Sequence, residues 1–291
     1  MALGPDDLVS SHFTLTGSQP MTAPRFAFAE RAAAAAGAGF AGIGVLGEDY
    51  LAETEQGLTD ADAAAILADH GLELAEVEFV FDWSAGDDEP ERQQNGRQLE
   101  DHVWAVADTF GPRVVSVGEL VPAEMLPPFD VVAERFGALC DRAAAHGLLV
   151  ALEFMPFCGI PDIATGRALV EAVDRPNAGL NVDSYHYFRG NPDPDVLRAV
   201  GDRAFMIQLD DADAELVGEL FEDTMLRRRY PGEGSFDLVE FLRILDEAGA
   251  SCPKSVEILS TDNQGLAVEE SARRAHDATR AVVDAARAAS G

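Results

Sequence analysis

One junction recurs along this chain, and it limits the folds that the sequence can adopt. An alanine-rich stretch typical of a helix ends at a glycine and is followed at once by an apolar stretch typical of a strand; the glycines are Gly37, Gly71, Gly147 and Gly249. Glycine is expected just past a helix, where a left-handed backbone conformation closes the last turn. Successive glycines are 34, 76 and 102 residues apart, which fits about one, two and three strand–helix units of roughly 34 to 38 residues.

Eight units of this length fill the 291 residues of the chain. The candidate strands lie at residues 11–17, 40–46, 72–81, 113–120, 148–154, 178–184, 204–210 and 254–260. Helical stretches of alanine, acids and arginine lie between them, among them residues 59–70, 90–110, 130–146, 163–174, 236–248 and 268–289. Strands that alternate with helices predict a parallel sheet, and eight of them predict a closed α/β barrel, the (β/α)8 TIM barrel. We expect one domain over residues 1–291.

An open, doubly wound α/β sheet is the alternative fold. It is disfavoured because no GxGxxG turn follows the first strand. The glycines of GAGFAG at residues 37–42 lead into a strand rather than a helix, so they do not form a phosphate-binding loop. The longest irregular segment, at about residues 211–235, follows the seventh strand, and we expect it to cover the functional site.

The charge balance excludes one class of partner. Only 21 Lys and Arg residues stand against 52 Asp and Glu, for a net charge of −31, whereas nucleic-acid binding depends on basic side chains. The three cysteines form neither a disulfide framework nor a CxxC zinc motif. No secretory signal is visible, and no apolar run has the length of a membrane span. We therefore expect a cytoplasmic protein that binds neither nucleic acid nor membranes.

The last four predicted strands end in side chains that carry oxygen. These are Glu153, Asp183, Gln208 and Glu257. A charge at the end of an apolar strand is costly unless something pairs with it, and the carboxyl ends of barrel strands meet at one mouth. Three carboxylates and one amide form a hard, all-oxygen donor set that suits Mn²⁺ or Mg²⁺. The spacing therefore predicts a divalent metal site, with structural coincidence as the alternative.

Short motifs around these positions resemble a known family. They are EF at Glu153, NVDSYH at 181–186, QLDDAD at 208–213, RRYPGEGSFDL at 228–238 and SVEIL at 255–259. Together they resemble the xylose-isomerase-like TIM-barrel superfamily of sugar and sugar phosphate isomerases, epimerases and dehydratases. AP endonuclease family 2 has the same fold as this superfamily. The match covers mainly residues 148–260. It implies a divalent metal bound by Glu153, Asp183, Gln208 and Glu257, with Mn²⁺ expected and Mg²⁺, Co²⁺ or Zn²⁺ as alternatives.

The chain departs from the family pattern at the third ligand position. Most members have His there, whereas this chain has Gln208. Some bacterial 3-dehydroshikimate dehydratases of the superfamily also have Gln, so the departure favours a dehydratase. An endonuclease is disfavoured, because its multi-zinc site needs several more histidines and a basic face for DNA.

Two further side chains are candidates for substrate binding. His186 follows Asp183 by three residues, and the family's D-x-x-H pattern implies that His186 reaches the substrate. Its alternative role is that of a structural loop histidine. The run Arg227-Arg228-Arg229 either directs one arginine at an oxyanion of the substrate or neutralises nearby acids. The position next to the family motif makes Arg229 our candidate.

These residues support three hypotheses about function. The first is a divalent-metal-dependent isomerase or epimerase of a sugar, polyol or hydroxyketone, in which Glu153 and Glu257 transfer a proton through a metal-stabilised enediolate. The second is a metal-dependent dehydratase, a carbon–oxygen lyase of the 3-dehydroshikimate or inosose dehydratase type. The third is a non-catalytic sugar-binding barrel. The sequence leaves the substrate open, and it leaves open whether identical copies assemble, as barrels of this family often do.

Overall fold

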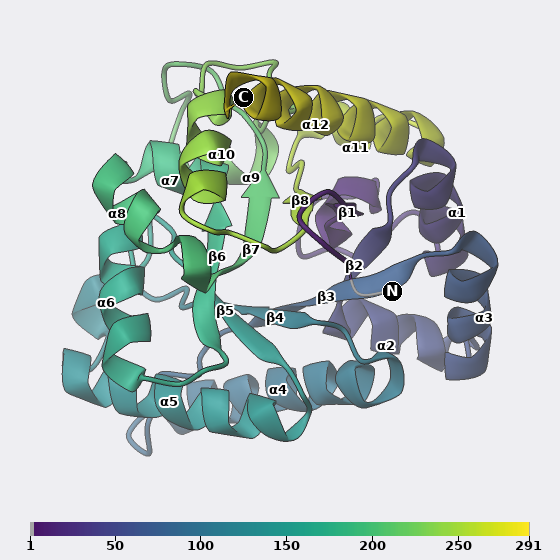
Figure 1. Ribbon diagram of the computed structural model, residues 1–291. Coiled ribbons are helices and arrows are strands. Elements are labelled where there is room, and N and C mark those ends of the chain that lie inside the picture. Colours follow the sequence, from purple (N-terminus) through teal and green to yellow (C-terminus); the bar gives the residue numbers. More distant parts are fainter. Residues whose placement is uncertain (1–2, 291) are drawn as a thin grey trace.

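A computed structural model describes residues 3–290 of the protein. In this range eight parallel strands close into a barrel in chain order, with β1 paired to both β2 and β8. The strands are β1 (Leu8–Ser10), β2 (Gly42–Leu46), β3 (Glu73–Val80), β4 (Val114–Val117), β5 (Leu149–Glu153), β6 (Ala178–Asp183), β7 (Ala204–Leu209) and β8 (Lys254–Val256). This closed parallel barrel confirms the predicted TIM-barrel fold (Figure 1).

Helices surround the barrel and connect its strands (Figure 1). They are α1 (Phe28–Ala38), α2 (Gly47–Glu55), α3 (Asp60–His70), α4 (Pro90–Phe110), α5 (Phe129–Ala145), α6 (Ile163–Val173), α7 (Ser184–Arg189), α8 (Pro194–Ala199), α9 (Leu220–Leu226), α10 (Leu238–Glu247), α11 (Thr261–Gln264) and α12 (Val268–Ser290), with short 3-10 helices η1 (His12–Leu15), η2 (Ala123–Met125) and η3 (Gly201–Arg203). Helix α12 packs against both α1 and α10, so the end of the chain closes the helical layer beside its beginning. Within the described part of the chain, no helix has the length and apolar character needed to cross a membrane.

The glycine junctions mark helix ends, with one shift. Gly71, Gly147 and Gly249 follow α3, α5 and α10 and have φ angles of 65°, 74° and 91°, a left-handed conformation that glycine adopts without steric strain. The prediction for Gly37 is wrong by two residues. Gly37 lies inside α1, and Gly39, with φ 104°, ends that helix by donating its backbone N–H to carbonyls of the last turn.

The first strand also lies earlier than predicted. We expect it at residues 11–17, but β1 ends before this range and most of the range forms η1. The reason is a side chain that replaces strand hydrogen bonds. The hydroxyl of Thr14 donates to the carbonyl of Val256 at 2.7 Å and accepts the backbone N–H of Ile258 at 2.9 Å. The other predicted strands and the six predicted helices overlap the observed elements, with ends shifted by a few residues.

The strands have an apolar outer face and a polar inner face near the mouth of the barrel. On β6, Leu180 and Val182 belong to the main apolar core, whereas the alternating Asn181 contacts Gln208 across the interior. Successive strand residues point to opposite faces of a sheet. The apolar residues therefore pack the barrel against its helices, and the polar residues line the inside.

Glu76 on β3 is one of these inward polar residues. It is buried, and its Oε1 accepts the hydroxyl of Ser255 on β8 at 2.9 Å. Burial raises its pKa to about 8, with the charge of Glu257 adding to the shift and the Ser255 hydrogen bond opposing it. Gly44 on β2 leaves room for this side chain, since a Cβ there would lie 2.7 Å from Glu76.

We expect Glu76→Gln to stabilise the protein increasingly from pH 5 to pH 9. The uncharged carboxyl of Glu76 makes its full contribution to the free energy of unfolding below the pKa of the unfolded state, near 4.5. This contribution is lost as the pH rises through the pKa of the folded state, about 8. An amide does not ionise, so the free energy of unfolding of the variant relative to wild type should rise by roughly 2–4 kcal/mol. Denaturant titrations at both pH values measure this. A pH-independent difference, equal to that of the exposed control Glu55→Gln, contradicts it.

Candidate functional site

The four predicted strand-end residues meet at one mouth of the barrel. Glu153 and Asp183 end β5 and β6, Gln208 lies one residue before the end of β7, and Glu257 directly follows β8. All four are buried, with exposed fractions between 0% and 7%. The carboxyl ends of parallel barrel strands converge, and the structure brings these side chains together there.

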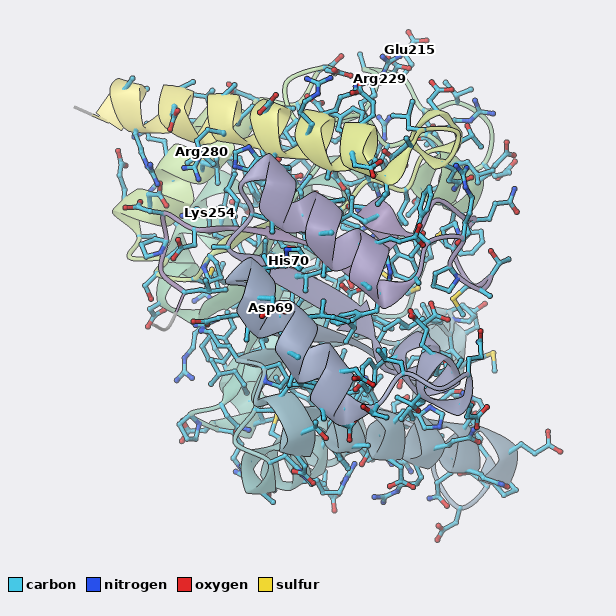
Figure 2. All side chains as sticks on the ribbon, turned by 90° about the vertical axis from the view of Figure 1, so that its right-hand side faces the viewer. Asp69, His70, Glu215, Arg229, Lys254 and Arg280 are labelled. Atoms are coloured by element: carbon cyan, nitrogen blue, oxygen red, sulfur yellow. The ribbon has the colours of Figure 1, made fainter. Side chains whose placement is uncertain are left out.

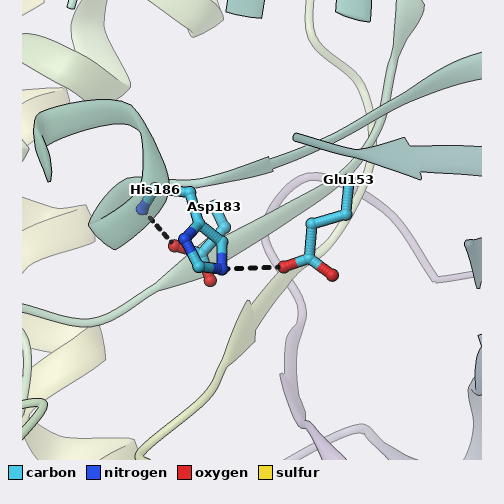
Figure 3. Close-up of side chains that lie close together, drawn as sticks. All are labelled: Glu153, Asp183 and His186. Carbon is cyan, nitrogen blue, oxygen red and sulfur yellow. Dashed lines mark hydrogen bonds and ion pairs between the residues drawn. The ribbon is translucent and has the colours of Figure 1, made fainter. Parts of the chain in front are cut away.

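Asp183 caps the short helix α7, and this cap fixes the positions of both Asp183 and His186. Its Oδ1 accepts the backbone N–H of His186 at 2.9 Å, the hydrogen bond of an N-cap aspartate to the residue three positions on. The imidazole lies near Glu153, with 3.5 Å between Nε2 and Oε1 (Figure 3). One ligand atom from each of the three residues lies within 4.8 Å of the other two. The D-x-x-H spacing therefore has a local structural cause.

The structure places Arg228 at this mouth, and not Arg229. The backbone of the arginine run forms isolated bridges to the chain after β7 on one side and after β8 on the other. In such an extended segment alternate side chains point in opposite directions. Arg228 consequently lies inside and is 2% exposed. Arg229 lies near the outer edge of the molecule in Figure 2 and pairs with Asp213 at 2.8 Å.

The guanidinium of Arg228 lies among buried acids. Its Nη1 is 2.7 Å from Oδ2 of Asp183 and 3.1 Å from Oε2 of Glu257, and it also contacts Asp210. Its Nη2 is 3.4 Å from Nε2 of His186. The acids around this guanidinium and imidazole are called the carboxylate cluster: Glu153, Asp183, Asp210 and Glu257. One buried cation thus faces four acids.

Burial and mutual repulsion set the pKa values at the mouth. Burial raises the pKa of Glu153 well above its usual range, and the charges of Glu257 and Asp183 raise it further. Burial also raises the pKa of Glu257, although Arg228 opposes the shift. Burial raises the pKa of Asp183, but its interactions with Arg228 and His186 lower the pKa by more, so the net shift is downward. Burial lowers the pKa of His186 to about 4, which leaves the imidazole neutral at pH 7.

Gln208 belongs to a chain of hydrogen bonds inside the barrel. Its Oε1 accepts Nδ2 of Asn181 at 2.6 Å, and its Nε2 donates to Oε1 of Glu257 at 3.3 Å. The hydroxyl of Ser11 donates to the same carboxylate oxygen at 3.1 Å. Gln208 therefore orients Glu257, while its role as a metal ligand stays a prediction.

The donors at the mouth fit a divalent cation. Four acids surround a single guanidinium, and oxygens of Glu153 and Asp183 lie beside an imidazole nitrogen of His186. Such a set, mostly hard oxygen with one nitrogen, suits Mn²⁺, Mg²⁺ or Zn²⁺. The Nδ1 atom of His186 has no hydrogen-bond partner within residues 3–290. In this structure the positive charge among the acids comes from Arg228.

The mouth also contains a further acid, Glu78. Its position near a strand end predicts a surface or hydrogen-bonded role, with a pocket acid as the alternative. It is instead buried and lines the same cavity as Glu153 and Glu257, and its Oε1 has no partner in the described part of the chain. Burial and the charges of Glu257 and Glu76 raise its pKa well above the usual range. The two-residue spacing from Glu76, which places both acids on the inner face, is the signal that could have identified it.

A cavity of about 220 Å³ is lined by Glu78, Glu153, His186, Arg228 and Glu257 and is partly covered by α9. Phe221, Thr224 and Met225 of α9 contribute to its lining, so the segment after β7 covers the site as predicted, although part of it is helical. Asp223 fixes this helix to α7 by accepting the hydroxyl of Tyr185 at 2.6 Å.

We expect Arg228→Gln to destabilise the metal-free protein by about 3–5 kcal/mol, because buried acids lose their cation. Added Mn²⁺ should restore much of this loss, since a bound cation neutralises the same acids and stabilises the folded state. Arg229→Gln, which removes a partly exposed pair with Asp213, should cost less than about 1 kcal/mol. Unfolding curves in chelator and in Mn²⁺ measure both. Equal losses in the two variants, or no response to Mn²⁺, would contradict this assignment.

Known proteins similar in sequence to this chain include isomerases and dehydratases. An inosose isomerase from Halalkalibacterium halodurans is 34% identical over 148 residues, which are 50% of this chain and 51% of that protein. A 3-dehydroshikimate dehydratase from Pseudomonas aeruginosa is 28% identical over 267 residues, which are 87% of this chain and 39% of the relative. The chain thus spans about half the length of that isomerase and less of the dehydratase.

Solved structures and a family model agree with the fold. The crystal structure of the IOLI protein with a binding zinc atom has a TM-score of 0.83 and 23% identity, and the match covers 96% of this chain and 98% of that one. At this identity the likeness shows the fold alone. The family model described as xylose isomerase-like TIM barrel matches residues 32–281, well over half of the sequence. The chain therefore belongs to the xylose isomerase-like TIM barrel family.

Proposed function

We propose that the protein is a divalent-metal-dependent isomerase or epimerase of a hydroxyketone, such as a sugar or an oxidised polyol. The observation that carries this proposal is the pair Glu153 and Glu257. Both are buried with raised pKa values, and both line one cavity together with His186 and Arg228. The inosose isomerases among its relatives support the same class of chemistry.

The two glutamates approach the cavity from different sides, because they extend from β5 and β8, three strands apart in the barrel. One carboxylate removes the proton from the carbon beside the carbonyl. The other carboxyl returns a proton to the neighbouring carbon or to the opposite face. Their raised pKa values make these groups stronger bases than an exposed glutamate, which suits the removal of a weakly acidic proton near pH 7.

The other buried side chains bind and orient the substrate in this proposal. The guanidinium of Arg228 and the neutral imidazole of His186 donate hydrogen bonds to substrate oxygens, while Gln208 holds Glu257 in position. A divalent ion, for which we propose Mn²⁺, would polarise the carbonyl and stabilise negative charge on its oxygen. We propose Glu153, Asp183, Glu257 and Gln208 as its ligands, with His186 as an alternative donor.

A dehydratase is the second candidate. Two observations favour it: Gln208 stands where most family members have His, and the match to a 3-dehydroshikimate dehydratase extends over 87% of this chain. Both reactions begin with removal of the same proton. The dehydratase then expels a β-hydroxyl as water, for which a protonated carboxyl supplies the proton.

Isotope exchange separates the two candidates. Hydroxyketones incubated with the Mn²⁺-loaded protein in D₂O should gain deuterium beside the carbonyl without loss of water, as measured by NMR and mass spectrometry. A new enone or aromatic absorbance indicates the dehydratase instead, and the product mass is then lower by about 18 units, the mass of one water molecule. If neither exchange nor dehydration occurs with any acyclic or cyclic hydroxyketone, both enzyme proposals fail.

We expect Glu257→Gln to lower the exchange rate by about 10²- to 10⁴-fold, because the variant lacks one acid–base group. Glu119→Gln is the matched control. Glu119 is also a buried acid near a strand end, but it accepts the backbone N–H of Ser84 at 2.8 Å and is not among the residues that line the cavity. Circular dichroism confirms that both variants fold. Full activity in Glu257→Gln would contradict the acid–base role of Glu257.

A further inference from the structure

The cavity at the barrel mouth has acids and bases at its strand ends and apolar side chains around them. The charged side chains near the strand ends include Glu78, Glu153, Glu257, His186 and Arg228. The surrounding surface is mostly phenylalanine, methionine and leucine, and its main members form what is called the apolar wall: Met21, Phe79, Phe81, Leu120, Phe157 and Phe221. The wall comes from five separate parts of the chain.

Few hydrogen-bonding groups interrupt this wall. Among the described residues that line the cavity away from the strand ends, the polar side chains are Glu48 and Thr224. The hydroxyl of Thr224 already donates to the carbonyl of Leu220 at 2.8 Å. A ligand group that rests on the wall therefore finds little besides Glu48 to bond with.

Part of the apolar wall is open to solvent in the free protein. Met21 is 65% exposed, Phe221 is 56% exposed and Leu120 is 42% exposed. Large apolar side chains that stay exposed around one cavity mark a binding surface. A ligand that covers them gains roughly fourfold in affinity for each methylene group that it removes from water.

The wall is continuous with the charged part of the cavity. The ring of Phe157 contacts Phe221 edge-to-face, with 5.3 Å between ring centroids and an angle of 89°. The same ring lies 5.9 Å from the imidazole of His186. One small molecule can therefore contact His186 and the wall at the same time, which favours a substrate over a protein partner as the ligand that covers it.

A sugar or polyol fits this surface poorly. Such a compound carries a hydroxyl on nearly every carbon, and the hydroxyls beyond the reacting end would face phenylalanine and leucine. Each hydroxyl that leaves water without a new hydrogen bond weakens binding by roughly five- to a hundredfold. The apolar wall therefore selects against fully hydroxylated ligands.

We propose that the substrate is an amphiphilic hydroxyketone, with its hydroxyl and carbonyl groups at one end and an apolar ring or alkyl group at the other. The oxygenated end faces the carboxylate cluster, His186 and Arg228. The apolar end lies against Phe157, Phe221 and the rest of the wall. This inference rests on the proposed function, and it narrows the substrate class of the same site.

A matched pair of six-membered rings tests the proposal. 2-Hydroxycyclohexanone and a pentahydroxycyclohexanone (an inosose) share the reacting hydroxyketone and differ in the other hydroxyls. We expect the Mn²⁺-loaded protein to bind 2-hydroxycyclohexanone at least tenfold more tightly in calorimetry, and to exchange its α-proton with D₂O at a higher kcat/KM. Equal or tighter binding of the inosose overturns the inference, and so does failure to bind either ring.

Binding and exchange are measured separately so that the two proposals can fail separately. Exchange of the inosose with no preference for the apolar ring leaves the proposed function in place and overturns the substrate class. A tenfold binding preference without exchange of either ring supports the apolar specificity and argues against proton transfer.

A substitution in the apolar wall tests whether these residues cause the binding preference for 2-hydroxycyclohexanone. Phe221→Ser, at an exposed position, should reduce the binding ratio of the two rings at least threefold. Phe129→Ser is the control, because Phe129 is similarly exposed, at 51%, and lies outside this cavity. Sedimentation of wild type and variant completes the test. A dimer that dissociates in Phe221→Ser with an unchanged binding ratio would show that the wall joins two copies of the chain, which overturns the inference.

Discussion

The barrel mouth depends on one interaction, the contact of the Arg228 guanidinium with buried acids from neighbouring strands. It reaches Asp183 at the end of β6, Asp210 after β7 and Glu257 after β8. Carboxylates buried this closely repel each other strongly unless a cation lies between them. The backbone bridges that direct Arg228 inward also join the chain after β7 to the chain after β8. The same segment therefore sets both the shape of the mouth and its electrostatics.

Much of the fold and part of the site could be predicted because they depend on local rules. A glycine after an alanine-rich helix and an apolar run after that glycine are short-range signals, and the eight strand–helix units that their spacing implies allow few architectures. Once the strands are parallel and closed, topology alone brings Glu153, Asp183 and Glu257 to one end. The placement of His186 is equally local, because Asp183 caps the helix that carries it.

The parts that could not be predicted depend on contacts between distant segments. Three adjacent arginines have the same local signal, and only pairing with the chain after β7 and β8 determines that Arg228 points inward and Arg229 outward. The burial of Glu78 likewise depends on the register of β3 within the closed barrel. Thr14 displaces the first strand because it bonds to the far end of the chain, 242 residues away. Spacing indicates only that Glu78 shares a strand face with Glu76, and neither spacing nor composition shows the contacts of Arg228 and Thr14.

The apolar wall and the charged strand ends have a common physical consequence. Side chains such as Phe157 displace water from the cavity, and loss of water is the largest cause of the raised pKa of Glu153 and of the lowered pKa of His186. The same loss of water strengthens every hydrogen bond and ion pair that a ligand forms there. Replacing the wall with polar residues would admit fully hydroxylated ligands, but it would also return these groups toward their ordinary pKa values. Apolar specificity and acid–base strength at this mouth are therefore coupled, and a change in one alters the other.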